Sequence, residues 1–157
     1  MRLRSTPVRS RLVAVASGLS AAALLAGAAS ANVTLTQVSS DPYTNSTSQH
    51  AAQVEPDSFA YGNTIVAAAQ TGRFYDGGSS NICWATSTDA GATWANGCLP
   101  GITVHAASPG SATRVSDPAV AYDAKHNAWL ISSLPLDANV KAMGVYTSRS
   151  KIGRAHV

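Results

Sequence analysis

The sequence offers few residues from which a metal centre could be built. Its 157 residues include two cysteines and four histidines. Neither residue type forms pairs at the spacing that protein metal ligands require. The residues concerned are Cys83, Cys98, His50, His105, His126 and His156. We therefore expect no metal ion and no other cofactor.

Charged residues and helical periodicity are also scarce. Asp, Glu, Lys and Arg make up 12% of the chain, and no apolar pattern of helical period is sustained. Ser, Thr, Ala, Val and Gly are frequent instead, as in many secreted β proteins. The length from Asn32 to Ser150 suits one small domain. The sequence thus predicts an all-β fold.

The chain has one long apolar run, from Leu12 to Leu25, and several arginines precede it. Ala29-Ser30-Ala31 follows with the small-x-small pattern of a cleavage site. Residues 1–31 therefore predict a secretory signal peptide and a secreted protein. The run is too short to be a stable membrane span, although a retained N-terminal anchor is the alternative.

Removal of this signal changes the charge of the protein. The formal net charge of the whole chain is +3. Four arginines lie within residues 1–31, so seven of the eleven Lys and Arg residues remain against eight Asp and Glu, a net charge of −1. No basic stripe is left in the mature chain, and we expect neither nucleic acid nor an anionic membrane as a partner.

Short β-like segments separated by turns follow. We expect residues 32–54 to hold an N-terminal strand (32–39) and a polar linker. Four strands of an antiparallel meander come next, joined at Gly62-Asn63, through a loop over 71–81, and at Asp89 to Thr93. The predicted strands are 58–61, 64–70, 82–86 and 94–98.

The turn between the last two of these strands has the pattern Ser-x-Asp-x-Gly-x-Thr-Trp. It is formed by Ser87, Asp89, Gly91, Thr93 and Trp94. Asp89 can accept hydrogen bonds from nearby backbone N–H groups, and Gly91 can take a positive φ. This pattern resembles the Asp box (BNR repeat) of sialidase-like β-propellers, where the box serves the fold and lies away from the catalytic centre. The alternative is an unrelated Asp-x-Gly hairpin.

The same hairpin brings the two cysteines together. If Ser87 faces Trp94 across the turn, the antiparallel register places Cys83 opposite Cys98. Facing residues lie within disulfide range, and the exported compartment permits oxidation. We predict a Cys83–Cys98 disulfide; two free buried thiols, or a register shifted by a bulge, are the alternatives.

The strand order then begins again. The segment starting at Pro56 corresponds to the one starting at Pro118, and 144–148 corresponds to 83–87 at a spacing of 61 residues. This register places Ser148 on Ser87. Residues 55–150 are therefore predicted to be one four-stranded propeller blade plus most of a second, a partial ring that by resemblance has six blades in full.

The final residues, 151–157, break with the preceding composition. They are similar to the translation of a common sequencing adapter, so we predict a non-native tail on an N-terminal fragment. A genuine short tail is the alternative.

The resemblance also implies an activity. In sialidases three arginines bind the substrate carboxylate, an aspartate is the acid/base, and a tyrosine activated by a glutamate is the nucleophile. The Arg-Ile-Pro motif that usually carries the first arginine is absent here. Arg73 and Arg114 are the candidates for binding an anionic substrate, and Asp57 and Asp117 for the general acid. The alternative is that the two aspartates only stabilise turns, because each of them adjoins a proline.

We therefore expect a secreted propeller that acts on glycans or glycoconjugates, in the specific form an exo-sialidase-like glycoside hydrolase. The alternative is a non-catalytic Asp-box propeller that binds a glycan or a protein at the cell surface. A propeller lyase or hydrolase acting on another polymer is the third possibility.

Overall fold

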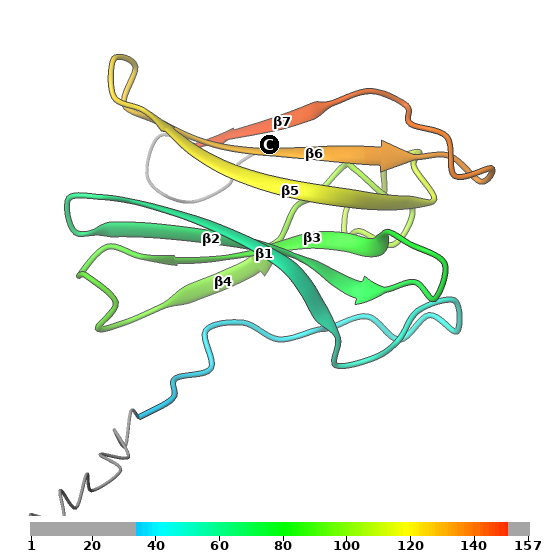
Figure 1. Ribbon diagram of the computed structural model, residues 1–157, viewed down its shortest axis with the longest axis horizontal. Coiled ribbons are helices and arrows are strands. Elements are labelled where there is room, and N and C mark those ends of the chain that lie inside the picture. The colour runs from blue at the N-terminus through cyan, green and yellow to red at the C-terminus, as the bar shows by residue number, and fades with distance from the viewer. Residues whose placement is uncertain (1–33, 151–157) are drawn as a thin grey trace, which may run out of the picture. The chain divides into compact units, whose positions relative to one another are not determined.

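A computed structural model describes residues 34–150, and the regular structure in this range consists of seven β-strands without a helix (Figure 1). The strands form one open antiparallel sheet in the order β1-β2-β3-β5-β6-β7, with β4 paired to β3. The prediction of an all-β fold is confirmed for these residues. The predicted signal peptide (1–31) and tail (151–157) lie outside the described residues.

The first four strands form the expected meander. They are β1 (Gln53–Tyr61), β2 (Thr64–Arg73), β3 (Ser79–Ser87) and β4 (Ala95–Cys98). Gly62, at a φ of 57°, lies in the two-residue turn between β1 and β2. The loop predicted over 71–81 is shorter than expected, because Thr71 pairs with Asn81 and Arg73 with Ser79. β3 is buried along most of its length, since it has strands on both sides.

Three further strands follow: β5 (Arg114–Asp123), β6 (Ala128–Leu136) and β7 (Tyr146–Ser150). Within residues 34–150, the two groups of strands are joined in the sheet only by the pair Ser79–Val115. In Figure 1 they lie over one another, with β5 against β1, β2 and β3.

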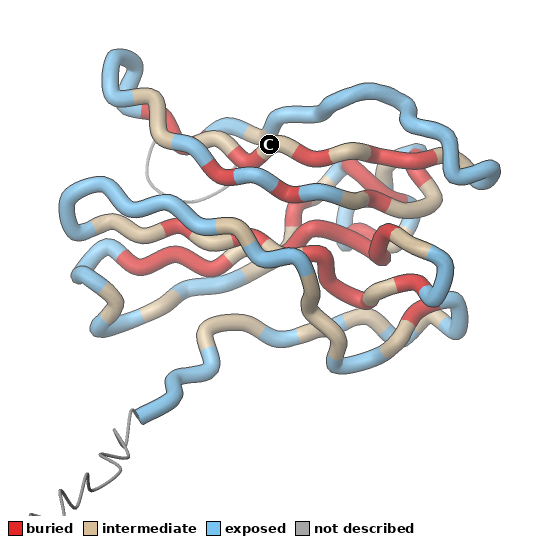
Figure 2. The backbone as a smooth tube through the Cα atoms, viewed as in Figure 1, coloured by how far each residue is buried: buried red, intermediate tan, exposed pale blue. Residues whose placement is uncertain are grey.

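The apolar core lies where the two groups meet. Buried stretches concentrate on β2, β3 and β6, whereas most of β1 and the hairpin tips are exposed (Figure 2). The buried core residues are Val66, Ala68, Ile82, Leu99, Ile102, Val115, Val120, Trp129 and Ile131. Aromatic rings continue the contact, because Tyr61 stacks on Tyr122 with 4.3 Å between ring centroids. Face-to-face burial of this kind holds the two groups of strands together.

The first strand of each group contains the same irregularity. The register shifts between Val54 and Asp57 in β1, and between Ser116 and Ala119 in β5. Each bulge contains an acidic residue and a proline, Glu55-Pro56 and Asp117-Pro118, and the acidic residue has a positive φ of 51° or 50°. A proline cannot donate to the ladder, which is why a bulge accommodates it. The equivalence of Pro56 and Pro118 is confirmed.

The spacing of 61 residues is wrong for the third strands. From the bulges onward the pairing makes Trp84 equivalent to Thr147, so Ser150, and not Ser148, takes the position of Ser87. The β5–β6 turn has four residues where the β1–β2 turn has two. An ungapped comparison of the sequence cannot register that difference.

The predicted strand over 32–39 is also wrong for its described part, because residues 34–39 belong to no strand. Leu35 is 92% exposed, and the Ser39 hydroxyl bonds the side chain of Gln53. Alternating side chains favour an extended backbone but do not supply the neighbouring edge that a strand needs.

Candidate functional site

The turn from Ser87 to Trp94 is closed by hydrogen bonds among Ser87, Asp89 and Gly91. The Ser87 hydroxyl donates to Asp89 Oδ1 at 2.7 Å and accepts from the Gly91 N–H at 2.8 Å. Gly91 has a φ of 94°, a conformation that a side chain would oppose.

The remaining motif residues complete the turn. Asp89 accepts from the Thr93 N–H at 2.8 Å and from the Thr93 hydroxyl at 2.6 Å. The Trp94 indole donates to the Gly91 carbonyl at 3.0 Å. The Thr93 and Ser87 donors lower the pKa of Asp89 to about 2. All five residues therefore act within the turn itself.

The disulfide prediction is confirmed. Cys83 pairs with Cys98 across β3 and β4, and their sulfur atoms are bonded. The bond fixes the short β4 strand to the buried β3 strand. It also holds the start of the loop that follows Cys98.

Asp57 does not lie free in a cleft. Its carboxylate accepts the backbone N–H of Val120 at 2.6 Å and so joins β1 to β5. The bond is charge-assisted and ties together the two groups of strands. Asp117 lies at the bulge of β5, is exposed, and accepts the hydroxyl of its neighbour Ser116.

Arg114 is held by the β2–β3 loop. Its guanidinium donates to Asp76 at 2.7 Å and to the Gly77 carbonyl at 3.0 Å, and it lies 4.7 Å from the Phe74 ring centroid. The Arg114 side chain is only 13% exposed. Its hydrogen bond lowers the pKa of Asp76.

Arg73, at the end of β2, donates to the Gln49 side chain at 3.2 Å. The four candidates for substrate chemistry therefore lie on three strands. Three of them, Asp57, Arg73 and Arg114, are hydrogen-bonded to distant parts of the fold.

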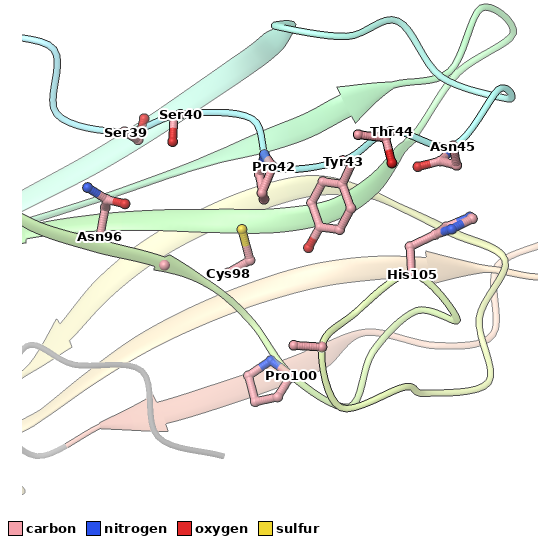
Figure 3. A pocket seen from close by; sticks show the side chains of 12 residues that line it. Ser39, Ser40, Pro42, Tyr43, Thr44, Asn45, Asn96, Cys98, Pro100 and His105 are labelled. Carbon is pink, nitrogen blue, oxygen red and sulfur yellow. The ribbon is translucent and has the colours of Figure 1, made fainter.

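A cavity that was not predicted lies elsewhere. Its volume is about 650 Å³, and it lies between residues 39–45 and the chain from β4 to residue 107 (Figure 3). Its lining residues are Ser39, Ser40, Pro42, Tyr43, Thr44, Asn45, Asn96, Gly97, Cys98, Pro100, His105 and Ala107. None of the four candidates is among them. We call this cavity the β4 pocket.

Hydrogen bonds fix the wall formed by residues 39–45. Asp41 accepts the N–H groups of Tyr43 and Ala52, at 2.9 and 3.3 Å. The Asn45 side-chain oxygen accepts from Ser80 at 2.9 Å. Asn81, fully buried in β3, donates both to the Tyr43 hydroxyl and to the Leu99 carbonyl. The pocket is therefore built by bonds between segments far apart in the sequence.

Burial favours the neutral forms of Tyr43 and His105, two ionisable side chains that line the pocket. Burial raises the pKa of Tyr43 and lowers that of His105. No Lys, Arg, Asp or Glu lines the cavity. The local sequence does not predict this pocket. Residues 40–54 have the composition of a polar linker, and the hydrogen bonds that position them join segments far apart in the sequence.

The described residues, 34–150, contain no group of three or more His, Cys, Asp or Glu side chains placed to hold a metal ion. In the same range no helix is long and apolar enough to cross a membrane. Comparison of the chain with protein-family models, curated proteins and solved structures gives no match.

Proposed function

We propose that this chain belongs to a secreted, sialidase-like Asp-box propeller that acts on glycans. The observation that carries the proposal is the Asp-box turn, in which all five motif residues bond within the turn. In this proposal β1–β4 form one blade and β5–β7 most of the next. The complete ring has six blades by resemblance, within the range of four to eight that propellers use.

The packing of the two groups supports the blade interpretation. Each group begins with a bulged strand, and the two first strands, β1 and β5, lie next to each other. Propeller blades are four-stranded sheets repeated around an axis, so the first strands of successive blades are neighbours. The disulfide is compatible with a secreted protein.

In the hydrolytic form of this proposal the protein is an exo-sialidase-like glycosidase. Arg73 or Arg114 would bind the substrate carboxylate, and Asp57 or Asp117 would be the general acid. Arg114 and Asp57 would then have to exchange their present bonds to Asp76 and Val120 for substrate.

A non-catalytic glycan-binding propeller is the second candidate, and those same bonds favour it. An arginine already paired with a carboxylate, and a carboxylate already bound to a backbone N–H, serve the scaffold as they stand. This form keeps the Asp-box fold and needs no arginine triad.

The test is hydrolysis of a fluorogenic sialoside by the secreted protein, with a glycan array as the binding assay. Turnover that is lost in Arg73→Ala or Arg114→Ala, in protein that remains folded, supports the hydrolytic form. Array binding without turnover supports the binding form. Absence of both turnover and array binding would contradict the proposal.

A further inference from the structure

The β4 pocket lies apart from the strands on which sialidase chemistry was expected. In the order of strand pairing β4 is at the opposite side of the first meander from β1. Its walls come from β4, from the loop after Cys98 and from residues 39–45. Its volume of about 650 Å³ falls within the range of about 300–1,000 Å³ typical of small-molecule sites.

Several polar side chains of the pocket are open to a ligand. The side chains of Ser40, Thr44, Asn96 and His105 make no hydrogen bond to other residues in the described range 34–150. Tyr43 accepts from Asn81, so its own O–H hydrogen is left to donate. In Figure 3 the Tyr43 ring lies between Cys98 and His105, and Asn96 lies at the end of the cavity near Ser39 and Ser40.

The apolar part of the lining is formed by flat or rigid groups. The Tyr43 ring, Pro42 and Pro100 face the same space as the polar groups. A pyranose ring has a matching character, because its C–H faces are apolar and its hydroxyls both donate and accept hydrogen bonds. Tyrosine offers a flat apolar body with a polar end, which suits such a ligand.

The charge of the pocket selects among sugars. A carboxylate or phosphate is normally bound by arginine, lysine or a set of N–H donors. The lining contains no arginine or lysine, and burial favours the neutral form of His105. An anionic sugar would lose solvation here without gaining an ion pair.

We propose that the β4 pocket binds a neutral sugar unit of a glycan, a hexose or an N-acetylhexosamine. The proposal stands on the pocket itself and does not require sialidase chemistry. It assigns the hydrogen-bonding contacts to Asn96, Ser40, Thr44 and the Tyr43 hydroxyl.

Calorimetric titration of the secreted protein tests this. The ligands are lactose, N-acetyllactosamine, chitobiose and cellobiose, with 3′-sialyllactose as the charged counterpart of lactose. We expect at least one neutral disaccharide to bind. Binding by none of the four, or binding of 3′-sialyllactose without any neutral disaccharide, would overturn the proposal.

Two variants place the binding in the pocket. Asn96→Ala removes an exposed side chain that bonds no other described residue, and should weaken binding about tenfold without changing the thermal midpoint. Ala107→Trp, at an exposed lining position, should abolish binding by filling the cavity. Asn139→Ala, an exposed asparagine outside the pocket, is the matched control. Binding that survives Ala107→Trp would overturn the assignment.

Sialoside hydrolysis is measured on the same variants. The sugar-binding proposal succeeds or fails on the neutral disaccharides, and the enzyme proposal on turnover. Failure of one is therefore distinguishable from failure of the other.

Discussion

Two regions of the molecule use their polar side chains differently. Where β1 and the β2–β3 loop meet β5, Asp57 and Arg114 are bonded to partners distant in sequence. In the β4 pocket, the side chains of Asn96 and Ser40 make no hydrogen bond to another residue that the structure describes. The pocket walls are fixed by Asn81 and Asp41. The first pattern is that of a scaffold and the second that of a binding site, because a ligand needs groups whose bonds are not already made.

Among the variants that test this contrast, removal of the disulfide should have the largest effect on stability. It joins β3 to β4 and closes a loop with a sequence separation of 15 residues. The double variant Cys83→Ala/Cys98→Ala should lower the free energy of unfolding by about 3 kcal/mol, since the unfolded chain regains freedom. Chemical denaturation measures the loss.

The same variant should weaken sugar binding in the β4 pocket, because Cys98 lines it. In the hydrolytic form of the proposed function, sialoside turnover per folded molecule should change less. An unchanged denaturation midpoint would show that the disulfide is absent from the purified protein.

Arg114→Ala should have the next largest effect. It removes the bonds to Asp76 and Gly77 and the contact with Phe74. We expect the free energy of unfolding to fall by about 2 kcal/mol, as for other hydrogen bonds of charged groups.

Kinetics on folded Arg114→Ala sharpen the comparison. A scaffold role predicts an unchanged KM for a sialoside. A raised KM with an unchanged unfolding free energy would instead move Arg114 into the substrate site.

Asp57→Ala should destabilise the fold by about 1.5 kcal/mol, because the Val120 N–H loses its acceptor between the two groups of strands. Asp117→Asn is the control, since Asp117 is exposed, bonds only its neighbour, and asparagine tolerates its positive φ. Its effect should stay within about 0.5 kcal/mol. Equal effects of the two variants on the thermal midpoint would contradict the conclusion that Asp57, and not Asp117, stabilises the contact between the two groups of strands.

The smallest expected effect is the pH response of the β3–β4 turn, which contains Asp89. The folded-state pKa of Asp89 is about 2, below the ordinary 3.8, so its stabilising contribution is present above pH 4 and is lost as the pH falls toward 2. Carbon NMR of the carboxyl group measures this pKa directly. A value near 3.8 would contradict the bonds assigned to Thr93 and Ser87.

Asp89→Asn isolates the contribution of this group to acid unfolding. Asp76 and Asp123 also have lowered pKa values and titrate in the same region. The difference between the acid-unfolding curves of the unchanged protein and of Asp89→Asn therefore reports the contribution of Asp89. This difference should vanish below pH 2, where Asp89 is protonated in both the folded and the unfolded protein.

Features governed by short-range pairing were predictable from the sequence. The β3–β4 hairpin fixes its own register, so the pairing of Cys83 with Cys98 followed from the assumption that Ser87 faces Trp94. The strand order of the meander followed from turn residues such as Gly62.

What depends on distant contacts was not predictable. Nothing local to Tyr43 indicates that its hydroxyl meets Asn81, and nothing local to Arg114 indicates its bond to Asp76. The contact between Tyr43 and Asn81 helps to form the β4 pocket. The contact with Asp76 means that Arg114 already has a charged partner. The position of Ser150 depended on the length of a turn that alignment without gaps cannot register.

The most direct test measures two variants side by side, each for its thermal midpoint and for its affinity for the neutral disaccharide that binds best. Asp57→Ala should lower the midpoint and leave the affinity unchanged, whereas Asn96→Ala should weaken the affinity about tenfold and leave the midpoint unchanged. The opposite result, an affinity that depends on Asp57 and a fold that depends on Asn96, would contradict the division between scaffold and binding site.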